Sequence, residues 1–304
     1  MFATSSPARL RGLGLIALAA VSWGTTGSVT ALLVARAEAT PLVVGAARVL
    51  VAAVLLLAAA GVSRPRRGAV AGGRWPAPGD AWRCLALGAC MAVFQATYFT
   101  AVTRAGIAVT ALVAICSAPI MIAALAAVLL GERPTPRLAL ALGLGVAGTA
   151  LLVAAPVAGT AAPRPLSGVV LALGAGLAYA LYVVLAKAAL ARTAPLPLAA
   201  LTFVVAAVLL APALATPGAA RQLALGWPGL LYLGAVTTAG AYAVYMAGLR
   251  HVTAAAAGVA SLLEPLTATL LGVMLFGELL GVAAWAGAVH LLGALVLLAQ
   301  AERR

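Results

Sequence analysis

The chain has 304 residues, of which 65% are hydrophobic and 8% charged, with a formal net charge of +13 and a mean hydropathy of +1.15. Soluble domains carry about 25% charged residues, so a water-soluble globular protein of this composition would lack the polar groups to cover its surface. The positive charge does not indicate nucleic-acid binding, because the basic residues sit in short segments between apolar runs, where they orient membrane helices.

Apolar runs long enough to cross a hydrocarbon core of about 30 Å recur along the whole chain. They predict ten membrane-spanning helices, and therefore an all-α polytopic membrane protein. The alternating polar pattern of an outer-membrane barrel is missing from the sequence. The ten predicted helices cover about 12–35, 41–61, 81–103, 106–131, 136–155, 167–187, 195–215, 228–249, 253–277 and 280–300.

An internal repeat relates the two halves of the chain. Residues 105–133 align with residues 251–279 at a shift of 146, and each copy is an apolar run that holds one proline and ends in Gly-Glu. A second pair, 41–56 and 195–210, aligns at a shift of 154. Landmarks that recur in the same order predict a duplicated architecture.

The predicted halves are residues 1–157 and 163–304, joined by a linker rich in Pro, Ala and Gly. Five helices per half is an odd number, so the second half enters the membrane from the opposite side, which gives inverted repeats. With the N-terminus in the cytoplasm, 14 basic residues fall inside and four outside, and Arg48 within a span completes the 19. This excess predicts that both termini are cytoplasmic.

Three ionisable side chains lie well inside predicted spans: Arg48 in the second, Glu264 in the ninth and His290 in the tenth. A charge at the bilayer centre costs at least about 2.5–3.5 kcal/mol, so such residues face the bundle interior or a water-filled cavity. Arg48 and Glu264 are therefore candidates to line a substrate path, and Glu264 or His290 is a candidate proton carrier. The alternatives are a structural ion pair and a hydrogen-bonded buried histidine.

Pro119 and Pro265 occupy equivalent positions in the fourth and ninth spans. A proline inside a helix removes one backbone hydrogen bond, and paired interruptions in the two halves indicate a central binding site. We predict that both prolines are hinges, with a simple packing kink as the alternative. Glu132 and Glu278 follow at the span ends, where a cap or hinge role is favoured over substrate contact.

Polar and aromatic side chains at helical spacing are further candidates to line a cavity. Gln95 shares a helix face with Tyr98, and the same spacing recurs at Tyr179 and Tyr182. Interface anchoring or packing is the alternative for such aromatic residues. The predicted substrate-binding residues are Trp23, Arg48, Gln95, Tyr98, Tyr179, Tyr182, Tyr242 and Glu264.

The motifs of several enzyme classes are missing from the sequence. It has no Walker A motif and no H-E-x-x-H, and no G-x-S-x-G. Only Glu264 among the six acidic residues is central, so no paired-carboxylate metal site can be built, and the three cysteines lack C-x-x-C spacing. We therefore predict no catalytic residue, no metal and no cofactor.

The duplicated ten-span layout, Ser22-Trp23-Gly24, Arg48, and the segments LLGERP and EPLTATLLGVMLFGE resemble the EamA family of the drug/metabolite transporter superfamily. The resemblance covers residues 12–300. It implies two inverted five-helix repeats around a central cavity, alternating access, and export of metabolites such as amino acids, or of drugs.

The sequence thus predicts a secondary transporter that exports a small organic metabolite, an amino acid or related compound, across a bacterial inner membrane. Multidrug efflux and, further away, an intramembrane enzyme acting on a lipid are the alternatives. The expected partners are a small-molecule substrate and membrane lipid, with protons as a candidate coupling ion and no nucleic acid. A monomer or homodimer is expected, because both halves of the pathway lie in one chain.

Overall fold

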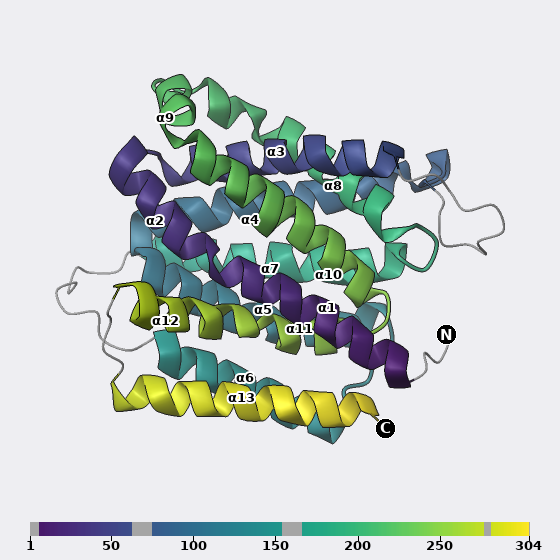
Figure 1. Ribbon diagram of the computed structural model, residues 1–304. Helices are drawn as coiled ribbons and strands as arrows, with labels where there is room; N and C mark the ends of the chain where they lie inside the picture. Colours follow the sequence, from purple (N-terminus) through teal and green to yellow (C-terminus); the bar gives the residue numbers. More distant parts are fainter. Residues whose placement is uncertain (1–5, 63–74, 154–165, 277–280, 304) are drawn as a thin grey trace.

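The computed structural model describes residues 6–62, 75–153, 166–276 and 281–303, and all regular structure within these ranges is helical (Figure 1). In this part of the chain, nine helical spans are long and apolar enough to cross a membrane, and Pro136–Leu152 is a shorter apolar helix. That helix, α6, has 18 residues, or about 27 Å at 1.5 Å per residue, which is close to the thickness of the hydrocarbon core. The chain is therefore an all-α polytopic membrane protein.

The helices follow the predicted spans closely in the first half. That half comprises α1 (Ser6–Gly24), α2 (Thr26–Ala37), α3 (Pro41–Val62), the short η1 (Pro78–Asp80), α4 (Ala81–Ala105), α5 (Ile107–Leu129) and α6 (Pro136–Val153). The second half comprises α7 (Leu166–Ala189), α8 (Pro195–Leu210), η2 (Ala211–Ala215), α9 (Ala219–Tyr232), the π-helix η3 (Leu233–Gly240), α10 (Ala241–Leu249), α11 (Ala254–Ser261), α12 (Leu263–Phe276) and α13 (Val282–Arg303).

The helix contacts are related by a pseudo-twofold symmetry, so that each contact of one half has an equivalent in the other. Helix α3 packs against its equivalent α8 at one edge of the bundle, and α6 packs against its equivalent α13 at the other edge (Figure 1). Helix α4 packs against α7 in the same way that α10, the counterpart of α4, packs against α1. The contacts therefore show the pseudo-twofold relation that the sequence repeat predicts.

Glycines at equivalent positions allow the closest crossings between the halves. A side chain at Gly88 in α4 would collide with Val205 in α8. Likewise, a side chain at Gly234 in η3 would collide with Val51 in α3. Small residues let membrane helices approach closely where dispersion contacts hold them together. The same contact is thus made twice, once in each repeat.

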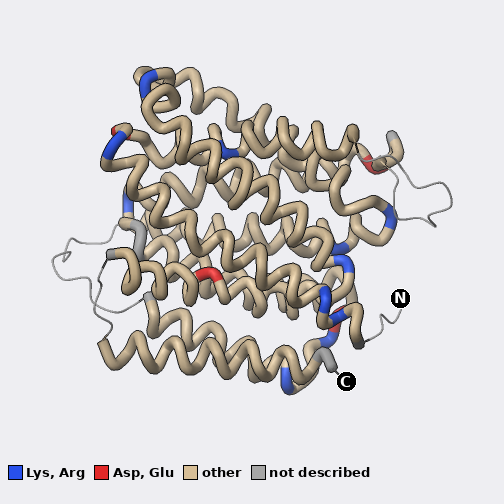
Figure 2. The backbone as a smooth tube through the Cα atoms, in the orientation of Figure 1, with Lys and Arg blue, Asp and Glu red and all other residues tan. Residues whose placement is uncertain are grey.

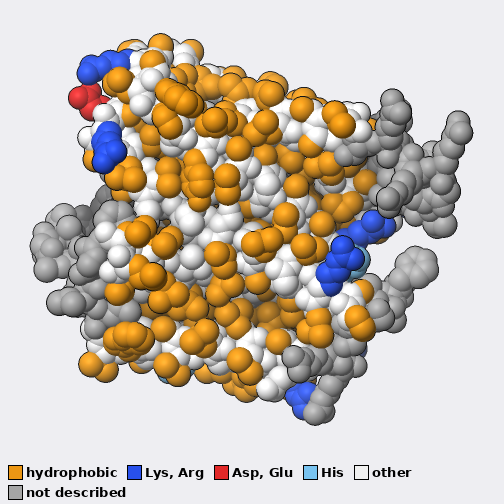
Figure 3. Space-filling model, in the orientation of Figure 1, with side chains coloured by type: hydrophobic (Ala, Val, Ile, Leu, Met, Phe, Trp, Pro, Cys, Tyr) orange, Lys and Arg blue, Asp and Glu red, His pale blue; other side chains and the backbone are white. Residues whose placement is uncertain are grey.

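The ends of the described chain lie at the same end of the bundle (Figure 1). Because five spans precede α7, this helix begins at the opposite end from α1, and the repeats are inverted. Charged residues gather at the two ends of the bundle (Figure 2), while the surface between them is largely hydrophobic (Figure 3). This distribution matches a bilayer around the middle of the bundle.

Two spans that the sequence predicted as single helices are broken. The first span breaks at Thr25, whose hydroxyl donates to the Ser22 carbonyl at 2.7 Å. The ninth breaks at Leu262, just before Pro265, which has no N–H to bond the preceding turn. The two breaks are adjacent, since a Cβ at Gly24 would lie 2.9 Å from the Glu264 carbonyl oxygen. Polar backbone from both halves therefore meets in the middle of the membrane.

The eighth span also differs from the prediction. Helix α9 begins at Ala219 rather than near residue 228, because its first turns pack through Gly226 and Gly229 on Leu33 of α2. The span then widens into the π-helix η3, where the hydroxyls of Thr237 and Thr238 both donate to the Leu233 carbonyl. Periodicity could not reveal these features, since both depend on neighbouring helices and local hydrogen bonds.

The crossing of α6 and α13 offers a test of this packing. We expect Gly148→Val to lower the free energy of unfolding by about 1–3 kcal/mol through overpacking. A Cβ at Gly148 would lie 2.7 Å from the Gly287 carbonyl oxygen and 2.8 Å from the Leu291 nitrogen, and backbone atoms cannot move aside easily. Gly143→Val on the same helix is the control, because nothing lies within 4 Å of a Cβ there. Equal melting temperatures of the two variants in detergent would contradict this packing.

Candidate functional site

A cavity of about 610 Å³ lies between the two halves. Trp23, Arg48 and Tyr242 line its deep part, near the middle of their spans, and the lining continues along α2 to Ala35 and along α4 to Val102. These last two residues approach the end of the bundle opposite the chain termini. The cavity therefore opens toward that end and is closed toward the other.

An aromatic cluster closes the deep end of the cavity. The Trp23 ring lies 5.0 Å from the Tyr242 ring and 5.2 Å from the Tyr245 ring, measured between centroids. The Phe203 ring lies 4.8 Å from Tyr242, and the Tyr182 ring lies 6.0 Å from it. Aromatic pairs at these separations attract each other beyond the effect of burial alone. The cluster joins both halves beneath the cavity and fills the path toward the termini.

Arg48 forms one charged wall of the cavity. Its side chain is only 9% exposed, and its Nη2 donates to the Gln95 Oε1 at 3.1 Å. The Phe99 ring lies 5.9 Å from the guanidinium carbon, at cation–π distance. Phe99 can reach this place because Gly45, about one turn earlier on α3, leaves room for the ring. Within the described chain, the Arg48 Nε and the Gln95 Nε2 have no hydrogen-bond partner.

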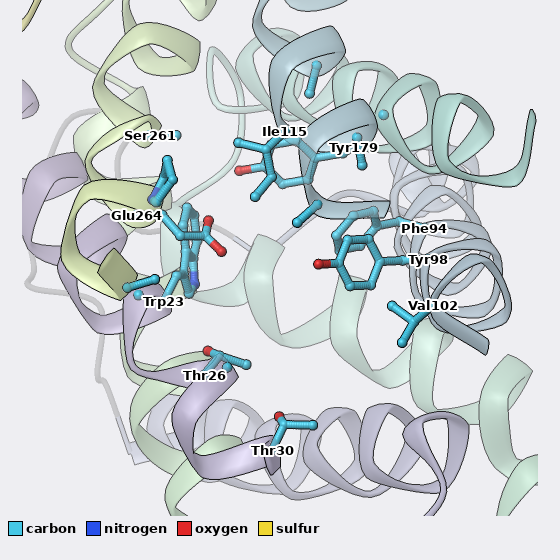
Figure 4. A pocket seen from close by; sticks show the side chains of 18 of the residues that line it. Trp23, Thr26, Thr30, Phe94, Tyr98, Val102, Ile115, Tyr179, Ser261 and Glu264 are labelled. Atoms are coloured by element: carbon cyan, nitrogen blue, oxygen red, sulfur yellow. The ribbon is translucent and has the colours of Figure 1, made fainter. Parts of the chain in front are cut away.

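Glu264 forms the other charged wall. The break at Leu262 and the close approach of Gly24 place it on the cavity, beside Trp23 (Figure 4). Arg48 and Glu264 act on each other electrostatically. They form no ion pair within 4.0 Å, so the structural ion pair considered from the sequence is not made between these described residues. Two opposite charges therefore face one cavity without neutralising each other directly.

The remaining polar side chains of the cavity come from α2, α4, α7, α11 and α12. The Tyr98 and Tyr179 hydroxyls point into the space that the Glu264 carboxylate also faces (Figure 4). Thr26 and Thr30 lie along the wall nearer the opening (Figure 4). Thr30 is not among the residues predicted from the sequence, although Trp23, Thr26 and Thr30 follow the spacing of one helix face.

The cavity gathers most of the residues predicted from the sequence. Seven of the eight predicted substrate-binding residues and both prolines line it: Trp23, Arg48, Gln95, Tyr98, Tyr179, Tyr242, Glu264, Pro119 and Pro265. Pro119 leaves α5 unbroken, unlike Pro265 in the ninth span. Substrate contact and hinge motion at these residues stay predictions.

Two predicted residues lie elsewhere. Tyr182 is fully buried in the aromatic cluster beneath the cavity, where its ring meets the Tyr242 ring of α10. His290 lies on α13 beside α6, and its Nδ1 is 2.7 Å from the Ala286 carbonyl oxygen one turn earlier. The structure therefore places the imidazole away from the cavity, in the hydrogen-bonded setting that was the alternative to a proton carrier.

The closed end is fastened by the first of the two Gly-Glu pairs. Gly131 adopts φ of +67°, which glycine tolerates, and the Glu132 N–H bonds to the Ala126 carbonyl, a Schellman-type end to α5. The Glu132 carboxylate then accepts hydrogen bonds from the Ala254 N–H at 2.9 and 3.2 Å, and so caps α11 of the other half. This is the predicted capping role; the second pair, residues 277 and 278, lies outside the described residues.

A cation supports this fastening. The Lys187 ammonium donates to the Leu249 carbonyl at 2.9 Å and to the Arg250 carbonyl at 3.3 Å, at the end of α10. Its charge also acts on Glu132. The ends of α5, α7 and α10 and the start of α11 are therefore held together on the closed side.

Metal chemistry has no visible basis in the described part of the chain, where no group of three His, Cys, Asp or Glu side chains could hold an ion. The site is instead a membrane-embedded cavity with two opposite charges and an aromatic floor. Its polar atoms can bind and orient a small organic molecule through hydrogen bonds and charge.

The fold and the cavity define a polytopic membrane protein with a central pocket between its two repeats. The chain belongs to the EamA-like transporter family, whose model matches residues 10–154 and 166–300. It is 38% identical over 298 residues to the uncharacterized transporter YwfM of Bacillus subtilis (strain 168), across 95% of this chain and 94% of that relative. A crystal structure whose protein is 24% identical has the same fold, with a TM-score of 0.77 over 97% of this chain and 96% of that one.

The Glu132 cap predicts a pH effect on stability. Burial raises the pKa of Glu132 above its ordinary 4.5, and the Ala254 N–H and Lys187 oppose this only in part. The folded chain therefore holds this proton more tightly than the unfolded chain, so the stabilising contribution is greatest at low pH and is lost as pH rises from about 4.5 through the raised pKa. We expect Glu132→Gln, which keeps an acceptor but does not titrate, to remove this part of the pH dependence.

Melting temperatures in detergent across this pH range would measure the effect. Glu38→Gln is the matched control, because Glu38 is exposed at the opposite end of the bundle. The interpretation fails if Glu132→Gln and the wild type lose stability in parallel as pH rises.

Proposed function

We propose that this protein is a secondary transporter that exports a small organic metabolite, an amino acid or related compound, by alternating access. The observation that carries the proposal is the central cavity, which is formed by both repeats, holds Arg48 and Glu264, and opens toward one end only. Secondary transporters built from inverted repeats bind their substrates near the midplane, at helix interruptions between the repeats.

The pseudo-twofold packing supports alternating access. Opening the other end would require the contact between Glu132 and α11 to break and the aromatic cluster around Trp23 to part. Because the repeats are inverted, a matching rearrangement in the other half would close the present opening. Pro119 and Pro265, which weaken the backbone ladder beside the cavity, are the proposed hinges.

The charge distribution supports the orientation of the bundle in the membrane that the proposal assumes. In the described chain, most basic residues outside the spans lie at the end where the termini lie, and fewer at the cavity opening. The larger group is Arg9, Arg11, Arg83, Arg133, Arg137, Lys187, Arg192, Arg250 and Arg303, and the smaller group is Arg36, Arg104 and Arg221. Under the positive-inside rule, this excess supports a cytoplasmic position for the termini and an outward-facing opening.

Two features bear on coupling and on the range of substrates. Glu264 is a half-buried carboxylate on the cavity, so it is the proposed site where a coupling proton competes with the substrate. The outer part of the cavity is lined by apolar side chains such as Val34, Val102 and Ile115, and this favours multidrug efflux as the second candidate. A cavity complete within one chain can work in a monomer or in each subunit of a homodimer.

Glu264→Gln tests the proposal. Cells that express the wild type are expected to resist toxic amino-acid analogues, and inside-out vesicles are expected to accumulate labelled amino acids. We expect Glu264→Gln to lower the accumulation rate about tenfold or more, or to flatten its dependence on pH, while the amount of folded protein in the membrane stays the same. Glu38→Gln is the control for the substitution itself, since Glu38 is exposed and is not among the residues that line the cavity. An equal loss of folded protein and transport would assign Glu264 a structural role instead.

A further inference from the structure

Each of the two charged walls of the cavity can bind a further charged group, an anion at Arg48 and a cation at Glu264. On the Arg48 wall, the guanidinium has one hydrogen bond, to Gln95, and the Arg48 Nε and Gln95 Nε2 have no partner within the described chain. Both side chains are more than nine-tenths buried, Gln95 being 1% exposed. Buried donors without partners are costly, and a buried cation still more so. An anionic group on the ligand, in reach of the guanidinium, would relieve that cost.

The Glu264 wall has the complementary character. The carboxylate points into the cavity beside the Trp23 ring and faces the Tyr98 hydroxyl across it (Figure 4). A cationic group placed there would meet a carboxylate and an aromatic face, which both attract cations. No basic side chain of the described residues forms an ion pair with Glu264 within 4.0 Å. The position is therefore open to a cation brought by the ligand.

The charge balance narrows the ligand further. The cavity wall carries one positive and one negative side chain, so the empty site is neutral as a whole. A simple anion would satisfy Arg48 but leave a negative charge beside Glu264, and a simple cation would do the reverse. A compact molecule that carries both charges satisfies both walls and keeps the site neutral, which matters most in the low dielectric of a membrane.

The cavity has room for an apolar part of the ligand beside its two charged groups. A cavity of about 610 Å³ exceeds what two small charged groups fill, and its outer walls include Val34, Val102 and Ile115. An apolar substituent directed toward the opening would bury itself against these side chains. The charged part would then lie deep, over the aromatic floor, with the apolar part above it.

We propose that Arg48 with Gln95 and Glu264 are the two subsites of one binding site, which holds a zwitterion bearing an apolar side chain. The carboxylate lies at Arg48 and Gln95, and the ammonium lies at Glu264 beside Trp23. This inference rests on the proposed transport function and adds the orientation of the substrate and the residues that select it. One charge comes from each repeat, since the equivalent of Arg48 is Thr202 and the equivalent of Glu264 is Ala118.

Matched probes can separate the two subsites. L-Phenylalanine carries both charges, phenylpropanoate only the anion, and phenylethylamine only the cation; L-leucine, isocaproate and isoamylamine form a second triplet. Dissociation constants are measured for the purified full-length protein in detergent by titration calorimetry. We expect at least one zwitterion to bind about tenfold or more tightly than both of its singly charged analogues, because each lost charge removes at least one charge-assisted contact.

The variants should act on different halves of the ligand. Arg48→Gln should remove the preference for the zwitterion over the amine, and Glu264→Gln should remove the preference over the carboxylate. Arg48→Lys keeps the charge and should retain the preference for the zwitterion with weaker binding, which guards against a fold defect in Arg48→Gln. Arg36→Gln and Glu38→Gln, which alter exposed charges of α2 and its end, should leave all the constants unchanged.

Two results would overturn the assignment. The first is that singly charged analogues bind as tightly as both zwitterions. The second is that Arg48→Gln and Glu264→Gln weaken the binding of all three members of a triplet equally. Proteoliposomes distinguish this failure from that of the proposed function. If they exchange a singly charged or neutral compound at a rate that Glu264→Gln lowers, transport stands and the zwitterion site falls. If they exchange no amino acid, analogue or drug, the proposed function falls with it.

Discussion

A guanidinium buried in the middle of a membrane bundle is the constraint on which this site depends. A charge at that depth is costly unless it has partners or water, and Arg48 has an amide, an aromatic ring and the cavity instead of a fixed anion. Its neighbours make this setting possible: Gly45 admits the Phe99 ring, and Gly234 lets η3 lie against the Arg48 backbone. The cavity is thus part of what solvates the charge.

The scaffold is nearly symmetric, but the chemistry is not. At the position equivalent to Arg48, Thr202 is buried and its hydroxyl donates to the Leu198 carbonyl of its own helix, so it presents no charge. At the position equivalent to Glu264, Ala118 precedes Pro119. A duplicated framework therefore supplies the symmetric packing, while one residue in each half supplies one of the opposite charges of the site.

Helix interruptions lie beside Glu264, while capped helix ends fasten the closed side. The breaks at Thr25 and Leu262 meet beside Glu264, where backbone groups in a membrane can be tolerated only next to protein or a solvated space. At the termini end, by contrast, Glu132 and Lys187 satisfy helix ends across the interface between the halves. Satisfied ends fasten one side of the bundle, and interrupted helices line the opening on the other.

Hydropathy and an internal repeat are local or pairwise properties of the chain, so the residues alone were enough to predict the membrane class, the number and order of the spans and their duplication. The sequence also identified Arg48 and Glu264, since a charge within an apolar run is visible without a fold. The packed fold was needed to show that Tyr182 lies beneath the cavity and His290 away from it. It also showed that Phe99 rather than an acid faces Arg48, and that the first and ninth spans break side by side. Helical periodicity gives the face on which a residue lies, but the rotation and crossing of each helix depend on contacts with partners that are distant in the sequence.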